Sequence, residues 1–213
     1  MAGCCDPRGC DRLFNDRFAK RMAARYRKKG LSTTARRMVA LLTGNGVQGA
    51  TVLEIGGGIG EIGLELLRRG AATVTNLELS PNYQPQAAAL AAERGVTGRA
   101  IHRLIDIAAD PAAVEPADLV VLHRVVCCYP DYATLLGAAA DHARRQLVFS
   151  FPPRNPASRA VVATQNALLR LSGRQFRTFA HPPAAMLGVL VDHGMRPAVT
   201  HHGPVWQVAS ASR

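Results

Sequence analysis

The sequence predicts an α/β protein in which a mostly parallel sheet carries helices on both faces and ends in an antiparallel hairpin. Between residues 51 and 151, five short apolar segments alternate with helical segments, and repeated strand–helix units form parallel sheets. Two further strands, 196–202 and 205–209, are joined by Gly203 and Pro204, a connection short enough for a hairpin. We therefore predict a Rossmann-like sheet of seven strands, five of them parallel.

Each element is placed where apolar periodicity begins and turn residues end it. The length of 213 residues and the apolar content of 48% fit one domain with a full core. The predicted strands are 51–55, 73–78, 99–105, 118–123 and 146–151, and the predicted helices are 60–69, 86–94 after Pro81, 131–143, about 157–171 and 183–193.

A helical lid, residues 1–46, is predicted to precede the main domain, residues 47–213. In the lid, Ser32 is placed to cap a helix that runs to about residue 42. Residues 154–180 interrupt the strand–helix alternation after the fifth strand. We predict that this insertion helps to bind the substrate.

The lid is also predicted to contain an amphipathic helix over residues 12–29. Phe14, Phe18, Met22 and Tyr26 recur every four residues and give one apolar stripe. An isolated helix of this length is marginal in water, so the stripe has to pack against something. We expect it to face the cleft of the main domain.

Positive charge is concentrated in the same region. Residues 8–37 hold eleven Lys or Arg and two Asp, a net charge of +9. The whole chain has a net charge of +11, so the rest of it is nearly neutral. Such a surface attracts an acidic small molecule or the phosphates of RNA, or is simply solvated. Because few aromatic residues are interleaved with the basic ones, binding of nucleic acid is not favoured.

A glycine turn follows the first predicted strand, in the run TVLEIGGGIG at residues 51–60. A strand, a glycine turn and a helix open a nucleotide-binding α/β unit. Gly58, Gly60 and Gly63 formally match the dinucleotide fingerprint, but the residue directly after the strand is Gly56. The pattern in register with the strand is therefore E-x-G-x-G-x-G.

This pattern, Glu54-x-Gly56-x-Gly58-x-Gly60, resembles motif I of the S-adenosylmethionine-dependent methyltransferases with a Rossmann-like fold. The resemblance implies a methyltransferase with S-adenosylmethionine as its cofactor, held by these four residues. A nicotinamide or flavin nucleotide is the alternative.

Two acids follow the next strands at the edge where ligands bind in open α/β sheets. Glu78 ends the second strand, about 20 residues beyond the glycine turn, where a carboxylate accepts from ribose hydroxyls. Asp106 follows the third strand, and we predict that it accepts from the adenine amino group. Asp118 begins the fourth strand and should lie at the far edge.

His123 ends the fourth strand and should border the methyl group and the cofactor. A general base helps methyl transfer only when the acceptor must lose a proton. A phenol or amine would need such a base, and a carboxylate would not. His123 is therefore a candidate catalytic residue, with packing beside the cofactor as the alternative.

Several segments are similar to magnesium-protoporphyrin IX methyltransferases, which esterify a porphyrin propionate. They are Phe14-Asn15, Tyr26, VVCCYPD at 125–131, RRQLVFSFPP at 144–153 and FAHPPAAMLGVLVDHGM at 179–195. The resemblance implies a catalytic role for Tyr26. Cys128 stands where that family has its partner His, which makes Cys128 a further catalytic candidate and leaves room for a different substrate.

The five cysteines, Cys4, Cys5, Cys10, Cys127 and Cys128, do not resemble a secreted disulfide framework. We therefore expect a cytoplasmic protein. The absence of C-x-x-C spacing gives no signal for a metal. A thiol cluster for a soft metal or metalloid is the alternative if the N-terminal segment folds over the active site. No run of 18 apolar residues occurs, so no membrane span is expected.

Together these features predict an S-adenosylmethionine-dependent methyltransferase of a small, acidic or planar molecule, with O-methylation favoured. An RNA methyltransferase and a non-catalytic S-adenosylmethionine-binding protein are the alternatives. The oligomeric state is not indicated by the sequence.

Overall fold

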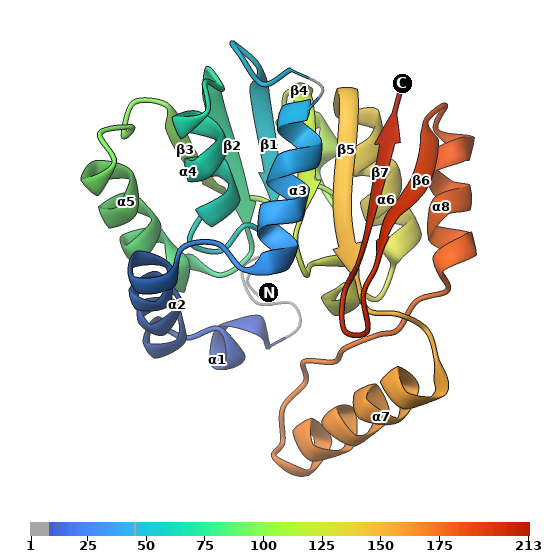
Figure 1. The fold of residues 1–213 in the computed structure, drawn as a ribbon. Helices are drawn as coiled ribbons and strands as arrows, with labels where there is room; N and C mark the ends of the chain where they lie inside the picture. The colour runs from blue at the N-terminus through green and yellow to red at the C-terminus, as the bar shows by residue number, and fades with distance from the viewer. Residues whose placement is uncertain (1–8, 45) are drawn as a thin grey trace.

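The computed structural model describes residues 9–44 and 46–213, and its centre is one seven-stranded sheet (Figure 1). The strands lie in the order β3-β2-β1-β4-β5-β7-β6. Strands β1 to β5 pair in parallel, and β7 pairs antiparallel with both β5 and β6. The strands are β1 Thr51–Ile55, β2 Thr73–Glu78, β3 Ala100–Leu104, β4 Ala117–Leu122, β5 Ala143–Phe151, β6 Arg196–His202 and β7 Gln207–Ser212. The predicted fold class is confirmed.

Helices cover both faces of this sheet, as alternation along the strands requires. Helices α2 to α5 pack in one apolar core and α6 and α8 in the other. Along β1, Val52 belongs to the first core and Leu53 to the second. The helices are α1 Cys10–Leu13, α2 Asp16–Lys29, α3 Thr33–Gly44, α4 Glu61–Arg68, α5 Gln84–Glu93, α6 Tyr132–Asp141, α7 Pro156–Leu171 and α8 Pro183–Asp192, with the short 3-10 turns η1 Pro81–Tyr83, η2 Pro111–Ala113 and η3 Val126–Cys128.

Two predicted elements are corrected. The helix predicted over 12–29 is broken in two, because the Asn15 side chain accepts a hydrogen bond from the Phe18 N–H at 3.0 Å and caps α2. The last strand begins at Gln207 and not at residue 205. Gln207 pairs with Phe151, whereas Val205 lies in the turn before it and is 65% exposed.

A salt bridge and a hydrogen bond hold the N-terminal helices close to the C-terminal end of β2. Arg27 of α2 forms a salt bridge of 2.6 Å with Glu93 of α5. The Ser80 hydroxyl donates to the Phe14 carbonyl oxygen at 3.4 Å. Helix α2 thus lies beside the glycine turn that follows β1, where the lid was predicted.

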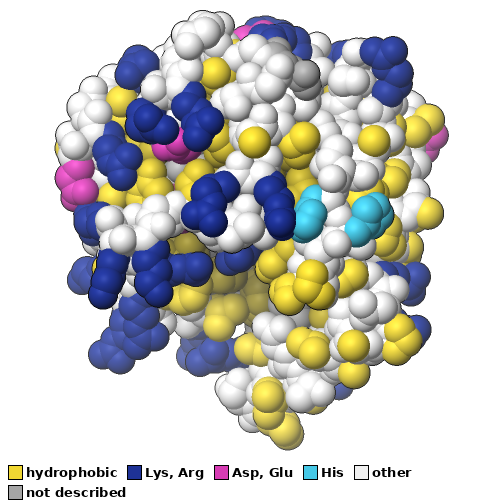
Figure 2. All heavy atoms as spheres, in the orientation of Figure 1, with side chains coloured by type: hydrophobic (Ala, Val, Ile, Leu, Met, Phe, Trp, Pro, Cys, Tyr) yellow, Lys and Arg dark blue, Asp and Glu magenta, His cyan; other side chains and the backbone are white. Residues whose placement is uncertain are grey.

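Helix α7 stands away from the sheet below β5 (Figure 1). It falls within the predicted insertion, and the chain returns from it to α8. The side chain of Asn166 in α7 bonds the backbone of Thr178 in both directions, at 2.8 and 2.9 Å. This arrangement leaves a hollow between α7 and the N-terminal helices (Figure 2). Among the described residues, no helix is long and apolar enough to cross a membrane.

Candidate active site

A cavity of about 220 Å³ opens at the carboxyl ends of the central strands. The strand order reverses between β1 and β4, which is where open α/β sheets bind ligands. Seven of the predicted site residues line the cavity: Glu54, Gly56, Gly58, Glu78, Asp106, His123 and Cys128. Its lining also includes Phe14, Phe18, Met22, Gly57, Glu61, Tyr83, Arg124, Val125 and Tyr129.

The glycine turn forms one wall. Gly56 and Gly58 have φ angles of 62° and 57°, in the left-handed region that glycine tolerates best. A Cβ on Gly56 would lie 2.6 Å from Val125 Cγ2, and one on Gly57 would lie 2.6 Å from Asn76 Oδ1. The turn therefore needs bare backbone both for its shape and for its close packing.

Glu54 supports this turn from below. Its side chain is buried and accepts a hydrogen bond from the Gly63 N–H at 2.9 Å. Burial raises its pKa to about 8, against the hydrogen bond from Gly63, which lowers it. Glu54 thus ties the end of β1 to the start of α4 while also reaching the cavity.

Asn76, which the sequence analysis missed, clamps the same turn. Its Oδ1 accepts from the Gly57 N–H and its Nδ2 donates to the Gly58 carbonyl oxygen, each at 3.1 Å. The sequence contains only a weak signal for it, a polar residue two positions before Glu78 in the same predicted strand. We call Glu54, residues 56–58, Asn76 and Glu78 the nucleotide wall.

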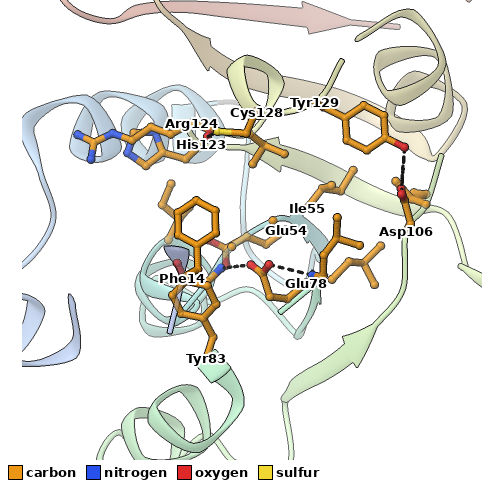
Figure 3. A pocket seen from close by; sticks show the side chains of 18 of the residues that line it. Phe14, Glu54, Ile55, Glu78, Tyr83, Asp106, His123, Arg124, Cys128 and Tyr129 are labelled. Carbon is orange, nitrogen blue, oxygen red and sulfur yellow. Dashed lines mark hydrogen bonds between the residues drawn. The ribbon is translucent and has the colours of Figure 1, made fainter. Parts of the chain in front are cut away.

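Glu78 lies where the sequence predicted it, at the end of β2 beside the turn (Figure 3). Its carboxylate accepts from the backbone N–H groups of Gly58 at 2.9 Å, Leu79 at 2.8 Å and Ser80 at 3.3 Å. Burial raises the pKa of Glu78, and these three donors oppose the rise. The amide of Gly58 therefore points to Glu78 and not into the cavity, while the carboxylate stands fixed at the cavity wall.

Asp106 and Tyr129 meet on the far side of the cavity (Figure 3). The Tyr129 hydroxyl lies 3.1 and 3.0 Å from the two oxygens of the Asp106 carboxylate and donates to it. Tyr129 comes from the loop after β4, so this bond joins two chain segments around the pocket. The sequence analysis predicted Asp106 but not its partner.

His123 lies at the end of β4 with its ring held on one side. Its Nδ1 lies 2.9 Å from the Ser150 hydroxyl of β5. Burial lowers its pKa to about 3, helped by the charge of Arg124, so the ring is neutral at physiological pH. Its Nε2 is buried without a hydrogen-bond partner in the described part of the chain.

Arg124 has a backbone conformation that is rare for a residue with a side chain, with φ at 62°. Its N–H donates to the same Ser150 hydroxyl at 2.9 Å, and its guanidinium lies 5.1 Å from the centre of the Trp206 ring. Its Nε is buried and has no hydrogen-bond partner among the described residues. His123 and Arg124 line the cavity, and we call these two residues and their partners Ser150 and Trp206 the acceptor wall, after the role predicted for His123. No pattern in the sequence indicates Ser150 or Trp206, because they meet Arg124 only through the fold of the sheet, and Arg124 has no sequence signal of its own.

The apolar stripe faces the cavity over part of its length. Phe14, Phe18 and Met22 line the cavity, and the rings of Phe14 and Phe18 lie 6.2 and 6.5 Å from that of Tyr83. These contacts give the cavity an apolar cover on the lid side.

Tyr26 does not line the cavity, so the catalytic role predicted for it has no support in this geometry. It is 3% exposed in the core, with the Arg94 guanidinium 5.1 Å from the ring centre. Eight residues separate Tyr26 from Phe18, which turns its side chain by about 80° and moves it about 12 Å along the helix. Residues spaced four apart rotate gradually away from a single face of an α-helix, because the helix has 3.6 residues per turn.

Gly60 also lies away from this cavity. A Cβ there would meet the Asn76 side chain at 3.4 Å and the His102 ring at 3.5 Å. Its φ of 75° shapes the start of α4. Gly60 is therefore a turn residue, and the predicted contact with the cofactor has no support here. Asp118 lies at the opposite edge, where it accepts from the Thr51 N–H at 2.8 Å.

The cysteines are only partly described. The Sγ atoms of Cys127 and Cys128 lie 3.6 Å apart in η3. Cys4 and Cys5 lie outside the described residues, and Cys10 marks the start of α1. No group of three or more His, Cys, Asp or Glu suited to a metal ion occurs in the described ranges.

Comparison with known proteins places this site in an enzyme class. Residues 52–146 match a family model described as a methyltransferase domain, and a search of curated protein sequences gives no match. Magnesium protoporphyrin IX methyltransferase from Synechocystis PCC 6803, crystallised with SAH, has a TM-score of 0.72 and 21% identity over 95% of this chain and 96% of that one.

Two other solved structures have the same fold. An O-methyltransferase family protein from Burkholderia thailandensis has a TM-score of 0.71 and 17% identity, over 94% of this chain and 61% of that one. An O-methyltransferase family 2 protein from Planctomyces limnophilus DSM 3776, in complex with apigenin, has a TM-score of 0.67 and 19% identity, over 96% and 64%.

Residues 52–146 thus form a methyltransferase domain, and the whole chain has the Rossmann-like fold of the solved methyltransferases that it matches. S-adenosylmethionine is the cofactor of this domain class and fold. The predicted enzyme class and cofactor are confirmed.

Proposed function

We propose that this protein transfers a methyl group from S-adenosylmethionine to an oxygen of a small, acidic, planar molecule. The observation that carries the proposal is a single cavity that joins the nucleotide wall to the acceptor wall. One wall offers the Glu78 carboxylate at a strand end, and the other offers a neutral imidazole and a guanidinium. A cofactor and an acceptor thus have separate chemical surfaces within reach of each other.

The nucleotide wall fits S-adenosylmethionine. Gly56 and Gly57 form a turn too tightly packed to accept a Cβ, so bare backbone faces the cavity, and Glu78 presents a carboxylate suited to two ribose hydroxyls. We place the adenine near Asp106 and Tyr129 and the methionine part near the glycine turn. When bound, the cofactor supplies an electrophilic methyl group on a sulfonium, which leaves as a neutral thioether.

His123 acts in this proposal as a positioning group and not as a strong base. A pKa of about 3 makes its ring a poor acceptor for the proton of a phenol or an amine. If the Ser150 hydroxyl donates to Nδ1, the unpartnered Nε2 carries the hydrogen and donates to an oxygen of the acceptor. A carboxylate acceptor needs no base, so this geometry favours an acid.

The charge around the mouth supports the same choice. Arg124 reaches the cavity with its guanidinium over Trp206. Lys and Arg side chains line the rim of the hollow below the N-terminal helices (Figure 2). An anionic acceptor gains from this field, and its planar part gains from the aromatic and apolar side chains of the cover.

The cover supplies the remaining requirement of methyl transfer. Phe14, Phe18 and Met22 shield the cavity from the lid side, and a water-poor site holds the acceptor in line with the methyl group without competing nucleophiles. The similarity to a porphyrin methyltransferase and to O-methyltransferases supports a small acceptor that is methylated on oxygen.

Cys128 is a better-supported catalytic candidate than Tyr26. Cys128 lines the cavity and remains a proposed contact of the acceptor, whereas Tyr26 packs in the core. The cytoplasmic location, the lid boundary at residue 46 and the absence of nucleic acid from the reaction stay predictions.

One assay tests the function. Purified protein is incubated with radiolabelled S-adenosylmethionine and either a fractionated small-molecule extract or purified RNA. We expect label in acidic aromatic fractions, released as methanol by mild alkali when the product is a methyl ester. Label in RNA would support the nucleic-acid alternative. Binding of S-adenosylhomocysteine without transfer to either pool would support a non-catalytic binding protein and overturn the proposal.

A further inference from the structure

We propose that Cys127 and Cys128 form a two-thiol site for a soft, thiophilic metalloid or metal centre at the wall of the cavity. Their Sγ atoms lie 3.6 Å apart, although neighbouring side chains usually point apart. Both sulfur atoms also lie near the Arg124 carbonyl oxygen, at 3.5 and 3.7 Å. The 3-10 turn η3 therefore gathers both thiols on one side of the backbone.

Three backbone hydrogen bonds hold the turn that carries the two thiols. The Cys128 N–H donates to the Val125 carbonyl oxygen at 2.8 Å, and the Tyr129 N–H donates to that of Val126 at 3.2 Å. The Phe179 N–H, from beyond α7, donates to the Cys127 carbonyl oxygen at 2.7 Å. The pair is thus pre-organised by the fold, so less ordering is needed when a ligand bridges it.

The surroundings lower the pKa of Cys127, which moves it toward the thiolate, the form that binds soft centres. The hydrogen bond with Cys128 lowers the pKa of Cys127 most, burial opposes it, and the positive charge of Arg124 lowers it further. Cys127 is buried, and Cys128 is partly buried and lines the cavity. A ligand therefore reaches the pair from the cavity side.

A bridging ligand suits this pair better than a disulfide does. A disulfide needs Cα atoms about 4.4–6.8 Å apart, whereas neighbouring Cα atoms across a trans peptide are about 3.8 Å apart. All peptide bonds in the described residues are trans. The sulfur atoms would also have to close from 3.6 Å to about 2.05 Å. A trivalent centre between the two sulfurs avoids this strain.

The pair needs no third protein ligand for a monosubstituted trivalent arsenic centre. Such a reagent, phenylarsine oxide, forms two As–S bonds, and its oxygen leaves with the two thiol protons as one water molecule. No oxidant or reductant is consumed. A structural zinc site would instead need four ligands, and no group of three exists in the described ranges.

The experiment uses the full chain with Cys4, Cys5 and Cys10 replaced by Ser, which leaves Cys127 and Cys128 as its two thiols. Intact mass and a free-thiol assay should show one equivalent of phenylarsine oxide bound and both thiols consumed. Binding should be at least ten-fold tighter for the folded variant than for the same variant unfolded in urea, because the fold pre-organises the pair. S-adenosylhomocysteine should slow the reaction several-fold, since Cys128 lines the cavity.

Adding Cys128→Ser to that variant supplies the matched control, and its thermal unfolding curve checks that it is folded. It should lose the stable adduct. Equal affinity in the folded and unfolded variants, or an adduct that survives Cys128→Ser, would overturn the proposal. A folded two-thiol variant that forms no adduct would do the same.

Discussion

The nucleotide wall and the acceptor wall of the cavity are assembled in different ways. The nucleotide wall comes from β1, β2 and the turn between β1 and α4, and its side chains bond mainly to nearby backbone amides. The acceptor wall draws His123 and Arg124 from the end of β4, Ser150 from β5 and Trp206 from the turn before β7. Its contacts join side chains that are distant in sequence.

This difference has a chemical consequence. In the nucleotide wall every polar side chain is already satisfied by backbone partners, which fixes its geometry before the cofactor binds. In the acceptor wall, His123 Nε2 and Arg124 Nε are buried without partners among the described residues. Buried polar atoms without partners are costly, and in the proposed function the acceptor supplies the missing bonds.

Replacing Glu78 by Ala should produce the largest effect. The change removes the proposed ribose contact and leaves the amides of Gly58, Leu79 and Ser80 without their acceptor. We expect S-adenosylhomocysteine to bind at least ~100-fold more weakly, equivalent to about 3 kcal/mol. Calorimetric titration measures this. Glu115→Ala, which removes an exposed carboxylate, is the control, and equal affinity in the two variants would remove Glu78 from the cofactor site.

Replacing Arg124 should weaken binding of the acceptor without weakening binding of the cofactor. Arg124→Gln removes the guanidinium charge, and Arg124→Gly also relieves the left-handed backbone, worth about 1 kcal/mol. Both should raise KM for an acidic acceptor by about ten-fold, equivalent to ~1.4 kcal/mol, and leave binding of S-adenosylhomocysteine within two-fold. Steady-state kinetics with the acceptor found in the transfer assay gives KM. A loss of cofactor affinity instead would place Arg124 in the nucleotide wall.

The pH dependence of stability should report on His123. The folded chain protonates His123 only near pH 3, whereas the unfolded chain does so near pH 6.5. The unfolded state therefore binds more protons in this interval, and the free energy of unfolding should fall as the pH falls below about 6.5, by up to ~1.4 kcal/mol per pH unit.

Urea titrations between pH 7 and pH 4 test this contribution. His123→Gln should flatten the acid side of the stability curve, and His202→Gln, at an exposed position, should leave it unchanged. An unchanged slope in His123→Gln would mean that the ring is not held neutral by the fold.

The smallest effect is expected at Tyr26. Tyr26→Phe should change kcat and KM by less than two-fold, because the ring packs under Arg94 and away from the cavity. Met22→Ala, on the part of the stripe that lines the cavity, should affect KM more. A large loss of kcat in Tyr26→Phe, with unchanged thermal stability, would restore the catalytic role predicted from the sequence.

The sequence alone determined the individual strands and most of the nucleotide wall, because both depend on local patterns. Apolar periodicity placed β1 and β2 at their observed bounds. The E-x-G-x-G-x-G spacing placed Glu54, Gly56 and Gly58 at the cavity, and the strand end placed Glu78. The role of Asn76 was not predicted, because a polar residue inside a strand does not indicate its partners until the turn folds over it.

Only the tertiary structure decided which lid residues reach the cavity and what completes the acceptor wall. Tyr26 shares a sequence repeat with Phe18, yet the 3.6-residue helical period rotates it into the core. Trp206 and Ser150 meet Arg124 and His123 because β5 lies between β4 and β7. A strand order is a long-range property, set by how the two apolar cores are buried on opposite faces of the sheet, and no short window of sequence contains it.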